Sequence, residues 1–318
     1  PNAQAAATSL GNIERVEVLK GPQGTLFGRN STGGAISVTT KQPGNVFEAS
    51  AEGELGDFDG RSAKVNLSGP ITDWFSAGIS GVYSRKDSYY TNLNYSADPS
   101  ILKAGRLKLN LQATDDLALR LTAFYSEQSG LGSLINKNTE PSLLGGAVGI
   151  QAQKDNYKAE LDFPVGSSSE QTVIYGDLIW NLPRFDFKLM LSDADITTKF
   201  AATDFDGSRM PIVGFDVAPN YSRPKTAELQ ILSNADSWAA DTFEWVAGLY
   251  YLENRAGLDP VNFYAAPGAL TSGFALAGLA VPSTVSSLVD RLPLQSTPLG
   301  DGVTVQLAGI LATEVTRP

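Results

Sequence analysis

A glycine-rich stretch near the start of the chain is the first candidate for chemistry, because such loops can cradle phosphate groups. A nucleotide-binding phosphate loop needs Gly-Lys followed by Ser or Thr, whereas Gly28 is followed here by Arg29 and Asn30. Glycine also permits positive φ and close approach of other backbone, so we expect a tight, shaped loop. The residues that define it are Gly21, Pro22, Gly24, Gly28, Arg29, Gly33 and Gly34.

Three charged residues, Arg15, Glu17 and Lys20, lie among apolar residues just before this loop. If the segment is enclosed by the rest of the protein, these charges need partners, because desolvating an unpaired charge is costly. The alternative is that they remain solvated in a wet interior. Four acidic residues on strands predicted further along the chain are candidate partners: Glu48, Glu52, Glu54 and Glu228.

The composition argues against catalysis. The 318 residues include no histidine and no cysteine, which removes the usual general base and the thiolate metal ligands. The formal net charge of −10 argues against nucleic acid as a partner, since phosphates require a basic face. We therefore expect no catalytic residues, no metal site, no cofactor and no enzymatic activity.

The elements around the loop are β-strands. Two short runs, 13–19 and 35–40, flank it, and from residue 46 onward apolar and polar residues alternate with period two. In 105–114, for example, Leu107 and Leu109 alternate with Lys108 and Asn110. Strict alternation predicts a sheet with one apolar and one wet face. The expected fold class is therefore all-β.

Strand length and loop length distinguish a membrane barrel from a soluble sandwich. The predicted strands run about ten residues or more, as tilted membrane strands do. Short turns alternate with long polar connections, which is typical of outer-membrane barrels. This scheme gives about nine spanning strands. The long outer loops are expected near 85–104, 129–169, 200–224 and 256–318.

Aromatic residues provide a second indication of a membrane. Trp and Tyr favour the two membrane interfaces, where the ring is in the apolar layer and its polar atom stays wet. All four tryptophans, Trp74, Trp180, Trp238 and Trp245, fall near turns predicted at one and the same end of the strands. The tyrosines expected at the opposite ends are Tyr83, Tyr89, Tyr90, Tyr125 and Tyr251.

Residues 14–43, ERVEVLKGPQGTLFGRNSTGGAISVTTKQP, resemble the end of the plug domain of TonB-dependent outer-membrane receptors. That family ends its plug with a pattern of the form IERVEVLRGPQG followed by spaced glycines, just before the barrel begins. The chain departs mildly from it, with Lys20 and Phe27 where Arg and Tyr are common. The resemblance implies a fragment with the C-terminal part of a plug at 1–43 and the first part of a transmembrane antiparallel β-barrel at 44–318.

The resemblance also implies a function. Members of the family lie in the bacterial outer membrane, contact its lipid, and import a scarce ligand, most often a ferric siderophore. TonB, acting through a box upstream of this sequence, would move the plug, so the glycine-rich loop and Arg15, Glu17 and Lys20 would shape or gate it. Alternatives within the family are a glycan, cobalamin or another metal complex. A passive porin-like barrel and a soluble β-rich binding protein are alternatives from other classes.

Overall fold

The computed structural model describes residues 10–22, 33–92, 99–130, 155, 157–159, 161, 166–204, 213–238, 244–258, 261–265 and 303–307. Every regular element in these ranges is a β-strand, and the prediction of an all-β fold is confirmed. None of the described residues belongs to a helix long and apolar enough to span a membrane.

In the N-terminal segment, β1 (Ile13–Lys20) pairs with β2 (Gly34–Thr40) as an antiparallel hairpin. These two strands are called the hairpin below. A bond from the Lys41 amide to the Asn12 carbonyl oxygen, at 2.9 Å, extends the pairing beyond the strands. Gly34 has φ of 137°, and a Cβ there would lie 2.4 Å from the Leu19 carbonyl oxygen. Only glycine fits at this position, so one of the predicted loop glycines has a specific steric role.

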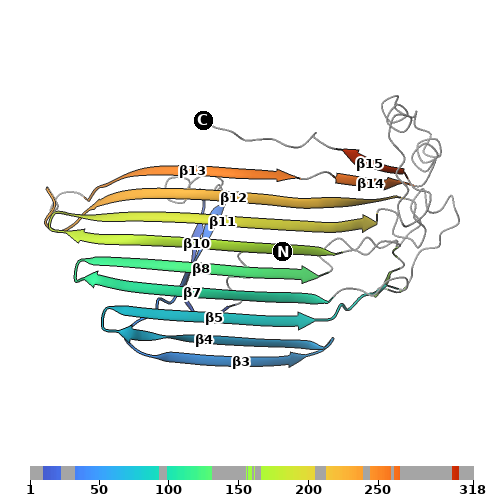
Figure 1. Ribbon diagram of the computed structural model, residues 1–318, viewed down its shortest axis with the longest axis horizontal. Helices are drawn as coiled ribbons and strands as arrows, with labels where there is room; N and C mark the ends of the chain where they lie inside the picture. The colour runs from blue at the N-terminus through green and yellow to red at the C-terminus, as the bar shows by residue number, and fades with distance from the viewer. Residues whose placement is uncertain are drawn as a thin grey trace.

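An eleven-stranded antiparallel sheet, called the wall below, forms the bulk of the molecule (Figure 1). Its order is β15-β14-β12-β11-β10-β8-β7-β5-β4-β3, with β13 paired to β12. Among the described strands, β3 pairs only with β4 and therefore forms one edge. The strands are β3 (Glu48–Gly56), β4 (Gly60–Thr72), β5 (Phe75–Lys86), β7 (Ser100–Thr114), β8 (Leu117–Gly130), β10 (Ser167–Leu182), β11 (Phe185–Asp204), β12 (Val213–Ser233), β13 (Val246–Leu258), β14 (Val261–Ala265) and β15 (Val303–Leu307).

Connections differ in length between the two ends of this sheet. At one end, two-residue turns at 73–74, 115–116 and 183–184 join consecutive strands. At the other end, the chain between β5 and β7 covers 87–99, and that between β8 and β10 covers 131–166. A short parallel pairing of β6 (Thr91–Asn92) with β9 (Lys158–Ala159) joins these two long connections.

The strands extend further than the sequence pattern predicted. The loop predicted at 200–224 was placed over too many residues. In the structure β11 continues to Asp204 and β12 begins at Val213, and Asp204 pairs with Gly214. Likewise β13, β14 and β15 occupy parts of the predicted loop 256–318. Register shifts between Thr198 and Phe200 and between Phe200 and Thr203 break the period of two along β11, so the pattern alone ended this strand too early.

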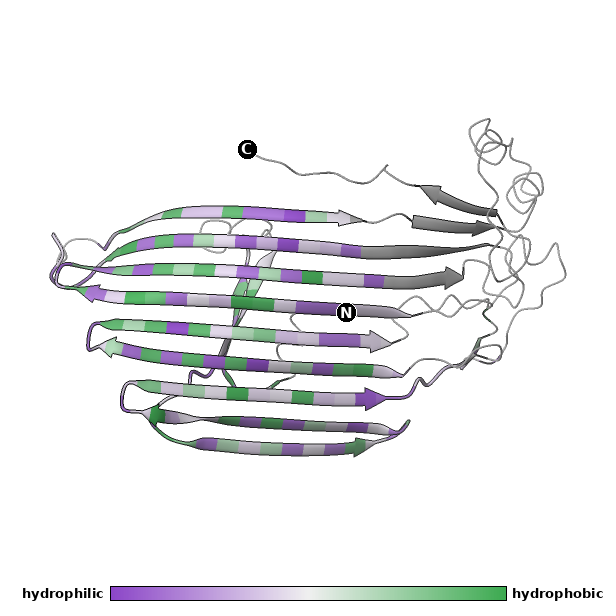
Figure 2. Cartoon of the chain, in the orientation of Figure 1, coloured by the Kyte–Doolittle hydropathy of each residue, from purple (hydrophilic) through white to green (hydrophobic). Residues whose placement is uncertain are grey.

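The two faces of the sheet have opposite character, and apolar and polar residues alternate along each strand (Figure 2). One face, called the inner face below, carries buried polar side chains that are only 3% to 7% exposed: Ser76, Ser80, Arg106, Lys108, Thr122, Ser126 and Gln171. The other face carries large apolar side chains between 41% and 73% exposed: Val65, Leu67, Ile79, Leu107, Leu119, Leu121, Ile174, Leu191 and Leu249. Soluble monomers rarely expose so extensive an apolar surface, and a lipid-facing barrel wall requires one.

Aromatic residues are sorted between the ends of the strands much as predicted. The tryptophans lie at the end with the two-residue turns, in or beside the connections after β4, β10 and β12: Trp74, Trp180, Trp238 and Trp245. Tyr83, Tyr89, Tyr90 and Tyr125 lie at or near the opposite end. Tyr251 lies near the middle of β13, so its expected position at the outer end is wrong.

Candidate functional site

The main polar contact between the hairpin and the sheet is made by Lys108. This residue lies on the polar face of β7 and is only 5% exposed. Its ammonium group donates hydrogen bonds to the Thr40 carbonyl oxygen at 3.0 Å, the Thr40 hydroxyl at 2.6 Å and the Lys41 carbonyl oxygen at 2.8 Å. Three donors of one side chain therefore hold the end of β2 against the sheet.

A second contact lies just beyond Lys41. The hydroxyl of Ser76, on β5, donates to the Pro43 carbonyl oxygen at 2.9 Å. A Cβ at Gly78, on the same strand, would lie 3.2 Å from the Ser68 Cβ and 3.7 Å from the Pro43 Cβ. The first distance is tight and the second is an ordinary contact, so glycine at this position mainly allows β5 to pack closely beside Ser68 of β4.

An apolar contact holds the start of the hairpin. Leu10 is fully buried and packs with Val82, Ala104 and Phe124, from β5, β7 and β8. The guanidinium carbon of Arg106 lies 5.8 Å from the centre of the Phe124 ring, in a cation–π arrangement. The hairpin is thus fixed at both its ends, by an apolar contact before β1 and by hydrogen bonds after β2.

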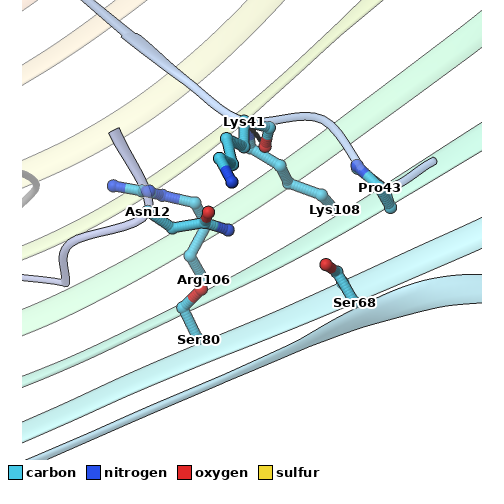
Figure 3. Close-up of a pocket in the computed structure, with 8 residues that line it drawn as sticks. Asn12, Lys41, Pro43, Ser68, Ser80, Arg106 and Lys108 are labelled. Atoms are coloured by element: carbon cyan, nitrogen blue, oxygen red, sulfur yellow. Dashed lines mark hydrogen bonds between the residues drawn. The ribbon is translucent and has the colours of Figure 1, made fainter. Parts of the chain in front are cut away.

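A small polar cavity lies between these two contacts (Figure 3). Its volume is about 10 Å³, which is the space of a single water molecule. Wall residues from three strands and three residues of the N-terminal segment meet around it. The lining residues are Asn12, Lys41, Pro43, Ser68, Gly78, Ser80, Arg106 and Lys108.

Two charged residues of β1 do not pair with the acidic residues of the wall that were predicted as their partners. Arg15 and Glu17 form an ion pair with each other at 3.2 Å, with side chains 58% and 45% exposed. Both therefore lie on the open surface of the hairpin, which agrees with the alternative that these charges stay solvated, and Arg15 pairs with Glu17 rather than with a predicted acidic residue of the sheet. Solvent screening explains this arrangement, because an exposed pair needs no buried partner.

The four predicted acidic partners also have other neighbours. Glu48 pairs with Lys41 at 3.4 Å, which does link the wall to the N-terminal segment, but through a different lysine. Glu52 pairs with Lys64 of the adjacent strand at 3.1 Å. Glu228 accepts a bond from Gln230 at 2.5 Å. Glu54 lies on β3 opposite Ser62.

The predicted loop residues are only partly covered by the structure. Gly21, Pro22, Gly33 and Gly34 are described, and Gly21 has φ of 83°. Gly24, Gly28 and Arg29 lie outside the described residues. A role for these glycines in gating stays a prediction.

Sequence reasoning missed the residues that make the closest contacts, namely Leu10, Ser76 and Lys108. The alternation placed Lys108 on the wet face of its strand but gave no partner for it. Within the described ranges, no group of three His, Asp, Glu or Cys side chains could hold a metal ion. What the arrangement can do is hold or release a segment lying on the inner face of a wall.

Comparison with known proteins agrees with this geometry. A family model described as TonB-dependent Receptor Plug Domain matches residues 2–35. The pesticin receptor of Yersinia pestis is 43% identical over 65 residues, which cover 20% of this chain and 10% of that protein. The ferric enterobactin receptor PirA of Pseudomonas aeruginosa is 30% identical over 173 residues, covering 46% of this chain and 23% of that protein.

Similarity to a solved structure covers more of the chain. The ferric yersiniabactin uptake receptor FyuA of Yersinia pestis superposes with a TM-score of 0.63 at 18% identity, covering 78% of this chain and 39% of that one. The chain therefore spans less than half the length of these proteins. The chain is therefore similar to TonB-dependent siderophore receptors in its plug-like sequence, and its fold matches part of the barrel wall of such a receptor.

Proposed function

We propose that this chain belongs to an importer that carries a ferric siderophore across the bacterial outer membrane. In this proposal residues 1–43 form the end of a plug, and residues 44–318 form the first part of the barrel that surrounds it. The observation that carries the proposal is the attachment of the hairpin, through Lys108, to the polar face of a sheet whose other face is apolar and exposed.

An outer-membrane location follows from the same two faces. A surface of exposed Leu, Ile and Val side chains suits the hydrocarbon layer, and the tryptophans at the turn ends suit its interface. A relative from Vibrio cholerae that is 30% identical over 122 residues is named an iron-regulated outer membrane virulence protein. That name supports the same location for this chain.

Energy input would come from TonB. A barrel whose lumen holds a plug cannot pass a bulky solute until part of the plug moves. The contacts of Lys108, Ser76 and Leu10 oppose that movement, so work must be done on the plug by a partner. TonB is that partner in this proposal, and it would engage a segment of the complete receptor upstream of this sequence.

The ligand class is proposed from the named relatives. Ferric enterobactin, ferrioxamine B and ferric yersiniabactin appear in the names of three similar proteins. These names share a ferric chelate, so a ferric siderophore is the proposed cargo. The long connections 87–99 and 131–166, at the end opposite the two-residue turns, would lie outside the cell where such a ligand arrives.

Uptake of radioactive iron tests the proposal. The full-length receptor is expressed in a strain lacking its own siderophores and siderophore receptors, and a panel of ferric catecholates and ferric hydroxamates is supplied. We expect saturable uptake of one chelate class that stops when TonB is deleted. Uptake that continues without TonB would indicate a passive pore, and uptake of only cobalamin or a glycan would overturn the proposed ligand class.

A further inference from the structure

Three aromatic side chains lie together at the outer end of the wall, which is the end with the long connections (Figure 1). Phe58, in the turn between β3 and β4, is 51% exposed, and Tyr89, in the connection after β5, is 53% exposed. The centres of these two rings are 6.4 Å apart in an edge-to-face arrangement, and the Tyr89 and Tyr90 rings are 4.4 Å apart. Rings at such separations pack favourably. The three residues are called the aromatic strip below.

The aromatic strip lies on the inner side of the wall. Lys86 lies an even number of residues from Ser76 and Ser80, in a strand whose pairing with β7 shows no register shift, and it therefore belongs to the inner face. Its ammonium nitrogen lies 5.6 Å from the centre of the Phe58 ring, in a cation–π arrangement. In a complete barrel the strip would border the lumen rather than the lipid.

Phe58 has a backbone conformation that phenylalanine rarely adopts. Its φ is 63°, and the φ of the next residue, Asp59, is 50°. Turn positions with positive φ favour Gly, Asn or Asp, and a bulky residue there is strained. The ring contacts with Tyr89 and Lys86 offset this strain. They keep an aromatic ring at a position where a smaller residue would suffice for the turn alone.

Two further contacts fix the strip in place. The Asp87 amide donates a hydrogen bond to the Phe58 carbonyl oxygen at 2.8 Å, which joins the turn to the connection after β5. The Arg85 guanidinium group pairs with the carboxylates of both Asp59 and Asp87, the latter at 2.7 Å. A surface that is already ordered loses little conformational freedom when a ligand binds to it.

We propose that the aromatic strip binds the aromatic rings of an incoming ferric chelate, so that the cargo is a catecholate and not a hydroxamate. This inference rests on the proposed function, which leaves the chelate class open. Catechol rings can pack against the rings of Phe58 and Tyr89, whereas hydroxamate arms present no ring. Ferric tris-catecholates also carry net negative charge, which the Lys86 ammonium attracts, while ferric tris-hydroxamates formed by uncharged arms are neutral.

Binding to the purified full-length receptor tests the chelate class. Dissociation constants are measured for the panel of ferric catecholates and ferric hydroxamates. We expect the tightest ligand to be a catecholate, by about tenfold or more over any hydroxamate. Tightest binding of a hydroxamate would overturn this inference but leave the import of a ferric siderophore in place. Binding of no ferric chelate would overturn both.

Substitutions in the strip supply the second measurement, made with the catecholate that binds most tightly. Phe58→Asn removes the ring but introduces a residue that tolerates positive φ, so the unfolding temperature should not fall while the dissociation constant rises several-fold. Tyr89→Leu keeps an apolar side chain without a ring and should also weaken binding. Tyr83→Leu, the same replacement on the apolar face of β5, is the matched control and should leave the dissociation constant unchanged. Equal dissociation constants in all four proteins would overturn the proposal.

Discussion

Lys108 and Thr40 are separated by 68 positions in the sequence, yet one ammonium group bonds both the carbonyl oxygen and the hydroxyl of Thr40. The contact joins the last residue of the hairpin to the seventh strand of the chain. Because its acceptors include two backbone carbonyl oxygens, the contact depends on the position of the segment more than on its side chains. Lys108 therefore acts as a positioning residue for the end of the hairpin.

Replacing this lysine should loosen the hairpin. Lys108→Met keeps the length of the side chain but removes all three hydrogen bonds, leaving the Thr40 and Lys41 carbonyl oxygens without this donor. We expect docking of the hairpin to weaken by about 1–3 kcal/mol, the usual cost of an unsatisfied buried polar group. Hydrogen exchange of the β2 amides in the full-length receptor, measured by mass spectrometry, should accelerate accordingly.

Lys64→Met is the control for this variant, because Lys64 bonds Glu52 within the wall at 3.1 Å. It removes a lysine from the same inner face without touching the hairpin. Equal exchange in Lys108→Met and the wild type would show that Lys108 does not hold the hairpin.

Arg15→Ala should have little effect on stability. The Arg15–Glu17 pair lies within β1, and both side chains are about half exposed. Exposed pairs of this kind contribute about 0–1 kcal/mol. The unfolding temperature of the full-length receptor should therefore change by no more than a few degrees. The resistance of the plug to protease should be unchanged. A large drop in the unfolding temperature would indicate that Arg15 has a partner in the complete barrel.

Leu10→Ala should separate the start of the hairpin from the wall. Leu10 is fully buried against Val82, Ala104 and Phe124, and truncation of such a residue costs about 2–5 kcal/mol. Protease sensitivity of the segment before β1 should rise. Val16→Ala removes an apolar side chain that is 54% exposed on the same hairpin and should leave the sensitivity near that of the wild type. Similar digestion of both variants would contradict the importance of the Leu10 contact.

Gly78 should tolerate a branched side chain poorly. In Gly78→Val, the Cβ would lie 3.2 Å from the Ser68 Cβ on the neighbouring strand, so β4 and β5 must shift apart locally. Such overpacking costs about 1–3 kcal/mol. Gly81→Val is matched in strand and chemistry, but the nearest atom to its Cβ, the Ala104 carbonyl oxygen, is 4.0 Å away. Calorimetry of the two receptors should show a lower unfolding temperature for Gly78→Val only.

The sequence predicted the fold well because alternation reports which face of a strand each residue occupies. Leu107 and Lys108 were assigned to opposite faces from that pattern alone, and the structure agrees. The partner of Lys108 could not be predicted, because the register between Thr40 and β7 depends on packing across 68 residues. The partner of Arg15 was likewise not predicted, since a carboxylate on its own strand, that of Glu17, pairs with it without any long-range contact.

The contact of the apolar face with lipid can be tested, because the cost of a charged substitution there depends on its depth in the bilayer. Leu107 lies on this face near the middle of β7 and is 42% exposed, so Leu107→Arg would place a charge near the centre of the bilayer. Such a substitution costs about 2–4 kcal/mol at the midplane and about 0–1 kcal/mol near the interfaces. Ile101→Arg, on the same face of the same strand but next to its outer end, is the matched variant. Folding yield of the full-length receptor into lipid vesicles should fall clearly for Leu107→Arg and little for Ile101→Arg. Equal yields would mean that this face does not contact hydrocarbon.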